Sequence, residues 1–327
     1  MPSSAKAKLS HINRGIRRIY FANLKGDVRG TVRRYLVGTE PLTTNRWKVL
    51  SPSIYLISIL PAGSVILLTD PSLHFILLLL LATLGVVFLQ HSINLFNDVT
   101  DWVRQADVEK LNSWVRYYQG KINVVRYYTV INWILGSAMG ILALKLSERW
   151  AILWISVPLA GLGFLYNVGK TPLSYTHHSE WVTGLCYGPG VFGCLWWIAE
   201  PSLTIETILG ALGYGSLAIS VLLSHQPPQV LTDSIAGKRS FAVRFGASKA
   251  MKFAYAFFSF SLSTLICASL LSSNVSWFTK VLQIALTTVV LIQVRGKTMS
   301  PDWILTRSTL ILAPSLACEI LIRRVIP

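Results

Sequence analysis

Charged residues are scarce in this sequence of 327 residues. They make up 13% of the chain, whereas soluble domains carry about 25%. Hydrophobic residues make up 52%, and many of them stand in runs too long for the core helices of a soluble domain. The composition excludes a soluble enzyme and a disordered chain, and it indicates a polytopic membrane protein.

Cysteine is rare as well. The four cysteines lie in apolar segments without C-x-x-C spacing, at Cys186, Cys194, Cys267 and Cys318. We expect buried thiols, and neither a disulfide scaffold nor a cysteine metal site. The apolar runs also lack the two-residue alternation of a membrane β-barrel. The predicted fold class is therefore all-α.

A membrane-spanning helix needs about 20 largely apolar residues. Nine segments meet this requirement at least approximately, namely 49–68, 73–97, 126–146, 150–168, 181–199, 204–224, 253–272, 277–294 and 303–322. We therefore predict a polytopic membrane helical bundle of about nine transmembrane helices. It forms one domain over residues 49–327, and a basic arm over residues 1–48 precedes it.

Acidic residues are half as frequent as basic ones, with 14 Asp and Glu against 30 Lys and Arg. Nucleic-acid binding is one interpretation of such a basic chain. However, nine alternating spans place 25 basic residues on the side of the N-terminus and five on the other side, which matches the positive-inside rule. We predict a cytoplasmic N-terminus, or a stromal one in an organelle, and no nucleic-acid partner. The arm has no apolar core of a signal peptide and is expected to lie on anionic lipid.

The second predicted span ends in a stripe of polar side chains. They recur every three or four residues and so share one helix face, at His91, Asn94, Asn97, Asp98 and Asp101. Such residues at a membrane helix end mark a functional site by default. Asp107 follows six residues later and reaches the others only if the chain turns. Carboxylate and amide oxygens suit Mg²⁺, which proteins hold through few carboxylates and substrate phosphates.

A second polar stretch follows the sixth predicted span. Gln229 and Asp233 are four residues apart and can share a helix face, and Pro227-Pro228 just before them should break the helix. The run from Gly237 to Ser240 then offers two cations and a hydroxyl in a tight turn, which suits phosphate oxygens. Both stretches are predicted on the same membrane face. Together they could hold a Mg²⁺–diphosphate whose remainder is a lipid.

These residues resemble the UbiA superfamily of intramembrane prenyltransferases, over roughly residues 48–322. Asn97-Asp98-Val99-Thr100-Asp101 looks like the first motif of that family, and Asp233 with the run to Gly246 looks like the second. The spacing of Asp101 and Asp107 and the Gly-Lys-Arg-Ser run are closest to the 1,4-dihydroxy-2-naphthoate prenyltransferases, the MenA type. A third stretch, Tyr166 to Tyr175, is similar to the loop after span four, and Glu180 and Gly188-Pro189 continue the likeness.

The resemblance implies a membrane enzyme that transfers a polyprenyl or phytyl group from its diphosphate to an aromatic acceptor, with loss of CO₂ in the naphthoate case. Two Mg²⁺ ions would be bound by Asn97, Asp98, Asp101, Asp107, Asp233 and Gln229. The diphosphate would be bound by Lys170, Lys238, Arg239 and Arg244. Tyr166 would face the prenyl cation, so the expected catalytic residues are Asp98, Asp101, Asp233 and Tyr166. Asn94, His91 and His225 are expected in the substrate pocket.

Some features depart from the family, and other functions stay open. Many members carry Asp at the position of Gln229, so the number of metal ions is in question. Pro227-Pro228 is unusual for the family. The acceptor could also be 4-hydroxybenzoate, homogentisate, chlorophyllide or haem. A secondary transporter would show inverted repeats and charges at the bilayer midplane, whereas these acids cluster at one face. A non-catalytic partner of another membrane protein is a third alternative, and the sequence does not specify the oligomeric state.

Overall fold

A computed structural model of the protein describes residues 45–106, 112–294 and 299–325, and within these ranges the regular structure is all helical. Eight of the described helices are long and apolar enough to cross a membrane. The fourth of the nine predicted segments forms a shorter apolar helix, Trp150–Leu165. The predicted all-α, multi-pass bundle is confirmed, with one span shorter than expected.

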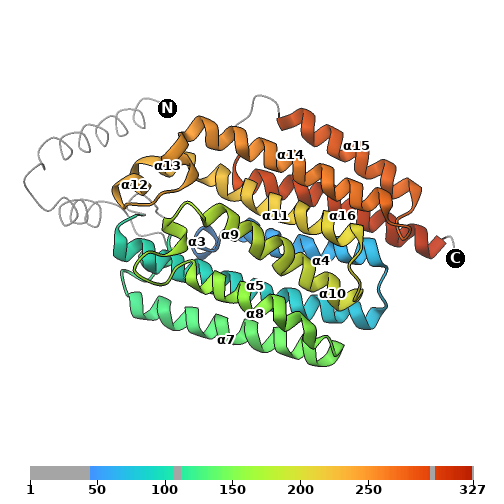
Figure 1. Ribbon diagram of the computed structural model, residues 1–327, viewed down its shortest axis with the longest axis horizontal. Coiled ribbons are helices and arrows are strands. Elements are labelled where there is room, and N and C mark those ends of the chain that lie inside the picture. Colours follow the sequence, from blue (N-terminus) through green and yellow to red (C-terminus); the bar gives the residue numbers. More distant parts are fainter. Residues whose placement is uncertain (1–44, 107–111, 295–298, 326–327) are drawn as a thin grey trace, which may run out of the picture.

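The helices run roughly parallel to the long axis of the molecule (Figure 1). The first half contains α3 (Arg46–Leu50), α4 (Leu56–Thr69), α5 (Leu73–Arg104), α6 (Trp114–Tyr117), α7 (Ile122–Ser147) and α8 (Leu153–Leu165). The second half contains α9 (Ser179–Leu185), α10 (Cys194–Ala199), α11 (Ile205–His225), α12 (Val230–Ile235), α13 (Phe241–Phe245), α14 (Ala247–Leu271), α15 (Trp277–Val294) and α16 (Pro301–Val325). Helix α5 packs along α7, and α11 packs along α14.

The apolar side chains face both the interior and the outer surface. The core includes Val65, Leu79, Leu217 and Phe258, all at most 2% exposed. On the outer surface, only 22% of the most apolar 18-residue stretch of α7 is buried within the protein. Trp154 on α8 is 86% exposed. Such a surface is unfavourable in water and favourable in hydrocarbon. The arrangement therefore fits an integral membrane protein.

A close approach of backbones holds α9 and α10 against α11. The residues between these two short helices, Cys186–Gly193, form a π-helix that contains Pro189. A Cβ atom added to Gly188 would lie 2.5 Å from the carbonyl oxygen of Ala211, so only glycine allows this contact. The packing of this part of the bundle depends on that approach.

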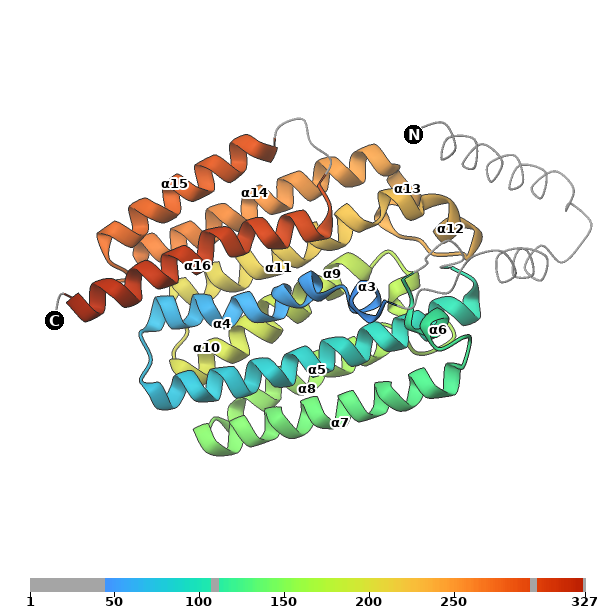
Figure 2. The same cartoon turned by 180° about the vertical axis from the view of Figure 1, so that it is seen from behind.

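Several short helices and connecting segments lie together at one end of the bundle. Helices α3, α6, α12 and α13 lie at this end, and the C-terminus lies at the other end (Figures 1 and 2). Helix α5 extends to Arg104, well beyond the predicted end of its span at residue 97, and so carries its polar stripe into this end. The two polar stretches singled out in the sequence therefore meet at one end of the molecule.

Candidate active site

A cavity of about 450 Å³ opens among α4, α5, α8, α9, α11 and α12. Polar side chains line one part of it, including Asn97, Asp98, Asp101, Asp233 and Lys238. Apolar and aromatic side chains line another, including Ile57, Ile93, Val182, Val221 and Tyr187. A volume of this size accommodates a small amphiphilic molecule. The cavity could therefore bind a ligand that has both a charged group and an apolar group, because it has lining residues that suit each of them.

The carboxylates of α5 are buried and held in place. Asp98 is 6% exposed and Asp101 is 1% exposed. The amide of Asn97 donates to Oδ2 of Asp101 at 2.9 Å, and the backbone N–H of Trp114 donates to Oδ2 of Asp98 at 2.8 Å. Residues 97, 98 and 101 lie within one helical turn, so the spacing read from the sequence does bring them together at the cavity.

Asp233 meets these carboxylates from the other half of the chain, with Lys238 between them. The ammonium of Lys238 lies 3.0 Å from Oδ2 of Asp101 and 3.6 Å from Oδ1 of Asp233. The turn that returns Lys238 to this place uses Gly237 at φ +79°, a conformation that suits glycine. The backbone N–H of Lys238 donates to the carbonyl oxygen of Asp233 at 2.9 Å, and the Ser240 hydroxyl donates to Oδ2 of Asp233 at 3.3 Å.

Tyr175 joins the same cluster, although the sequence assigned it no role. Its hydroxyl donates to Oδ1 of Asp101 at 2.8 Å. The cations of Lys238 and Arg104 lie 5.1 Å and 4.8 Å from its ring centroid, within the range of cation–π attraction. Tyr175 ends the third stretch that resembles the family, and this position is the only signal that could have found it.

Glu180 is a second residue whose place emerges only from the fold. It is 5% exposed and accepts hydrogen bonds from Nε2 of Gln226 at 2.7 Å and from the backbone N–H of Phe241 at 2.9 Å. Oε1 of Gln226 in turn accepts from the N–H of Ala242 at 3.0 Å. This network fixes the start of α13, directly after the turn that carries Lys238. Glu180 therefore positions the turn from the side of α9.

Most of the predicted pocket residues line the cavity. Asn94, Tyr166, His225 and Gln229 are among them, and Nε2 of Gln229 lies 3.2 Å from Nε2 of His225. His91 lies in the layer behind: its Nδ1 is 2.6 Å from the hydroxyl of Tyr55, which itself lines the cavity. The predicted break at Pro227 is present as a short 3-10 helix, Pro227–Gln229.

Three predicted diphosphate-binding residues lie elsewhere. Lys170, Arg239 and Arg244 are exposed and do not line the cavity. The guanidinium of Arg244 lies over the ring of Phe245. Their positions favour the rim of the molecule, whereas Lys238 is a cation that the described part of the fold brings to the carboxylates. Asp107, predicted as a metal ligand, lies outside the described residues.

Two adjacent histidines lie on this rim. His177 and His178 are exposed on the loop before α9, with ring centroids 3.9 Å apart. The neighbouring His178 lowers the pKa of His177 below its usual value, and Arg244 and Arg239 act in the same direction. His177 is therefore harder to protonate than an isolated histidine.

The residues of the cavity fit a hard cation. Among the described residues, no three His, Cys, Asp or Glu side chains lie close enough together to bind one ion by themselves. Mg²⁺ does not need such a group, because it keeps several waters and uses one or two carboxylates plus substrate phosphates. Asp98, Asp101 and Asp233 supply oxygen donors at one cavity, and Lys238 shows that positive charge is stabilised between two of them.

Comparisons with known proteins identify relatives of this chain. Two relatives are named 1,4-dihydroxy-2-naphthoate octaprenyltransferase. The protein of Bacillus subtilis strain 168 is 24% identical over 207 residues, 61% of this chain and 65% of that protein. The protein of Mycobacterium tuberculosis strain H37Rv is 28% identical over 176 residues, 52% of this chain and 59% of that protein. The chain thus spans less than two thirds of the length of the curated relatives it matches.

Solved structures show the same fold. A UbiA homologue from Archaeoglobus fulgidus bound to DMAPP and Mg²⁺ matches with a TM-score of 0.58 at 18% identity, over 85% of this chain and 98% of that chain. The same holds for a UbiA homologue from that organism bound to GPP and Mg²⁺, with a TM-score of 0.57. The model of the UbiA prenyltransferase family matches residues 55–306. Since this match covers most of the chain, the protein belongs to the UbiA prenyltransferase family.

Proposed function

We propose that this protein transfers a polyprenyl or phytyl group from its diphosphate to 1,4-dihydroxy-2-naphthoate, with loss of CO₂, in a Mg²⁺-dependent reaction. The observation that carries the proposal is the meeting of Asp98, Asp101, Asp233 and Lys238 at a cavity that also has apolar and aromatic lining. A prenyl diphosphate has the same division between a charged end and an apolar chain. The family and the names of the relatives support the reaction class.

The charged end would hold the diphosphate. Asp98, Asp101 and Asp233 would bind Mg²⁺, with the amide oxygens of Asn97 and Gln229 as further donors, and we propose two ions. The ions would neutralise negative charge on the leaving diphosphate. The ammonium of Lys238 lies 3.0 Å from Asp101, so it is within reach of phosphate oxygens bound at that carboxylate. Removing one such charge contact typically lowers a rate by about 10²–10³-fold.

The apolar walls would hold the prenyl chain and keep water from the allylic cation. Ile57, Ile93 and Val221 supply aliphatic surface, and Tyr166 and Tyr187 supply aromatic faces. An aromatic face stabilises a desolvated cation by about 2 kcal/mol or more. Excluding water also prevents the cation from being hydrolysed. Tyr166 is our candidate for the residue that faces the cation.

The acceptor would approach from the polar lining near Asn94 and His225. The allylic C–O bond breaks and the diphosphate leaves with the electron pair. A ring carbon of the naphthoate then forms the new C–C bond, and loss of its carboxyl group as CO₂ restores the aromatic ring. This route needs no strong general base. We further propose that the end of the bundle with the carboxylates faces the cytoplasm, or the stroma in an organelle, since the positive-inside rule places the basic connections there.

The test is turnover by the purified full-length protein in detergent. Geranylgeranyl, phytyl and longer prenyl diphosphates are each supplied with 1,4-dihydroxy-2-naphthoate or 4-hydroxybenzoate, with Mg²⁺ or EDTA. We expect a decarboxylated prenyl naphthoquinol that requires Mg²⁺. Asp101→Asn, which keeps the side-chain size, should lower the rate by about 10²-fold or more.

Glu148→Gln is the matched control, because this exposed acid does not line the cavity and lies in the connection between α7 and α8. It should retain full activity. Release of diphosphate without prenylation of either acceptor would keep the ionisation site and refute the naphthoate assignment. Survival of every prenyl diphosphate, with folding verified, would refute the prenyltransferase proposal.

A further inference from the structure

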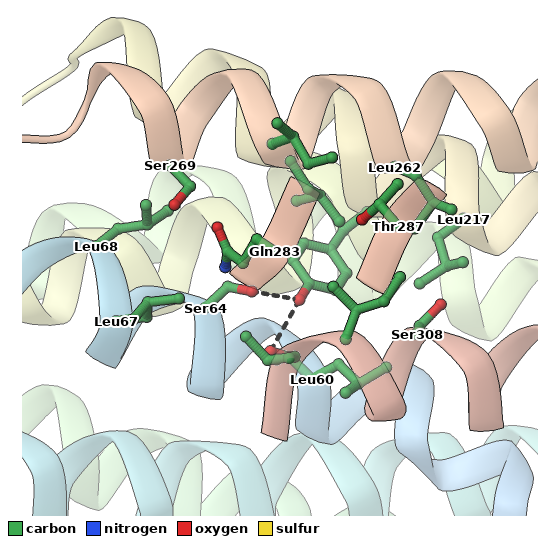
Figure 3. A pocket seen from close by; sticks show the side chains of 15 residues that line it. Leu60, Ser64, Leu67, Leu68, Leu217, Leu262, Ser269, Gln283, Thr287 and Ser308 are labelled. Atoms are coloured by element: carbon green, nitrogen blue, oxygen red, sulfur yellow. Dashed lines mark hydrogen bonds between the residues drawn. The ribbon is translucent and has the colours of Figure 1, made fainter. Parts of the chain in front are cut away.

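A second cavity lies inside the bundle, away from the carboxylates. It has a volume of about 50 Å³ and lies among α4, α11, α14, α15 and α16 (Figure 3). The two cavities share helices α4 and α11: Leu60 lies about one helical turn after Ile57, and Leu217 is the neighbour of Ala218. Leucine side chains dominate its wall, yet several polar groups also face it.

Three buried polar side chains line this cavity without a hydrogen-bond partner among the described residues. The atoms are Oγ of Ser269, Oε1 of Gln283 and Oγ1 of Thr287. Their residues are 2%, 7% and 3% exposed. They come from α14 and from two successive turns of α15, and Figure 3 shows all three around the same space. Buried polar groups are nearly always hydrogen-bonded in native proteins, so these three atoms call for a ligand.

The polar side chains on the opposite wall already have hydrogen-bond partners, and they can accept further hydrogen bonds. The hydroxyl of Tyr214 donates to the carbonyl oxygen of Leu60 at 2.9 Å and lies 2.6 Å from the hydroxyl of Ser64. The hydroxyl of Ser308 donates to the carbonyl oxygen of Ile304 at 3.0 Å. Hydroxyl oxygens keep free acceptor capacity after donating one bond. The cavity is therefore bordered by polar oxygens on both sides.

The volume decides what can fill the space. A water molecule needs about 10–15 Å³ of cavity space, so 50 Å³ has room for about three waters. It is too small for a quinone ring or a prenyl unit. Each water also needs two to four polar partners, and the oxygens of α4, α11, α14, α15 and α16 provide them.

We propose that this cavity is a binding site for a cluster of about three ordered waters. The cluster accepts and donates hydrogen bonds at Ser269, Gln283 and Thr287, and it bridges to the Ser64–Tyr214 pair. It therefore links α14 and α15 to the wall formed by α4 and α11. A hydrated site of this kind stabilises the half of the bundle that lies behind the substrate cavity.

The test is whether one substitution, Thr287→Val, lowers the Tm or leaves it unchanged or raised. Thr287→Val removes the hydroxyl and keeps the shape of the side chain. If water is bound, the change removes a hydrogen bond and should lower the Tm of the detergent-solubilised protein by about 2 °C or more. If the cavity is dry, the change removes an unsatisfied polar group and should leave the Tm unchanged or raise it.

Thr288→Val on the same helix is the matched control, because Thr288 is exposed and its hydroxyl bonds its own helix at Ile284. It should change the Tm less than Thr287→Val does. A structure at a resolution that shows ordered solvent should contain density within hydrogen-bond distance of Thr287 and Gln283. An unchanged or raised Tm for Thr287→Val, or a lack of such density, would overturn the proposal.

Discussion

Replacing Lys238 by methionine should destabilise the metal-free protein strongly. The ammonium lies 3.0 Å from Asp101 and 3.6 Å from Asp233, and the side chain is only 11% exposed. Methionine keeps most of the apolar stem of lysine and removes the charge. Two carboxylates that are at most 3% exposed then lose the ammonium that lies between them.

The distances set the size of the effect. At an effective dielectric constant of about 20, unit charges 3–4 Å apart attract by about 4–6 kcal/mol before desolvation is counted. Removing one partner of a buried ion pair typically costs about 3–5 kcal/mol, because the remaining charge is uncompensated. Since two charges remain here, we expect the upper half of that range, which corresponds to a fall in Tm of about 8 °C or more.

Mg²⁺ should reverse much of this loss, because a divalent cation restores positive charge between the carboxylates. The assay is thermal unfolding of the full-length protein in detergent, with EDTA or with Mg²⁺. We expect the rise in Tm on adding Mg²⁺ to be larger for Lys238→Met than for the wild type, since binding to the folded state alone adds stability. Lys249→Met is the matched control, because this exposed lysine starts α14 away from the cavity, and surface changes of this kind stay within about 0.5 kcal/mol.

Two outcomes would refute the reasoning. If Lys238→Met unfolds at the same temperature as the wild type in EDTA, the buried carboxylates are not held by this lysine. If the variant is destabilised and Mg²⁺ raises both Tm values equally, the carboxylates do not share a cation. The first outcome concerns the fold of the site, and the second concerns its metal.

Two further substitutions test the supports of the site. Glu180→Gln should cost about 1–3 kcal/mol of stability, because it weakens the buried network at the start of α13, and it should lower kcat more than the exposed Glu200→Gln does; equal kinetics for both would remove Glu180 from the positioning role. Gly188→Ala should destabilise by about 1–3 kcal/mol, because its Cβ would meet the Ala211 carbonyl at 2.5 Å, whereas Gly193→Ala has nothing within 4 Å. Equal Tm values for the two glycine variants would contradict the close approach.

Local spacing predicted the geometry of the first carboxylate group. Asn97, Asp98 and Asp101 follow the three- and four-residue period of a helix, and this period needs no knowledge of the rest of the chain. The same reasoning placed Gln229 and Asp233 on one face. Helical geometry is local, which explains why these parts of the site could be found in the sequence.

Helical period could not predict which way the side chains of Lys238 and Arg239 point. Lys238 and Arg239 are neighbours in the sequence, and both are basic residues on the same side of the membrane. In the structure Lys238 turns into the cavity, whereas Arg239 is exposed and bonds the Tyr175 carbonyl oxygen through its backbone. A turn directs adjacent side chains to different sides, and its conformation depends on contacts with other segments, here Glu180 on α9.

Tyr175 was missed for a similar reason. It is 74 residues from Asp101 in the chain, yet its hydroxyl bonds that carboxylate. A tyrosine near a membrane helix end is most often an interface residue, so its residue type gave no signal, and its place at the end of the family-like stretch assigned it no role. Only packing that brings distant segments together creates its role.

The sequence by itself determined the membrane character, the all-α class and the end of the bundle where the acids gather. These features follow from composition and helical period, because a chain in hydrocarbon must satisfy its backbone hydrogen bonds within each apolar helix. Only the tertiary structure decided that Lys238 meets Asp101 and Asp233, which residues anchor that turn, and where a second cavity with a few buried polar groups opens beside Leu60. Those features arise from contacts between helices, and the free energy of such contacts depends on the whole bundle.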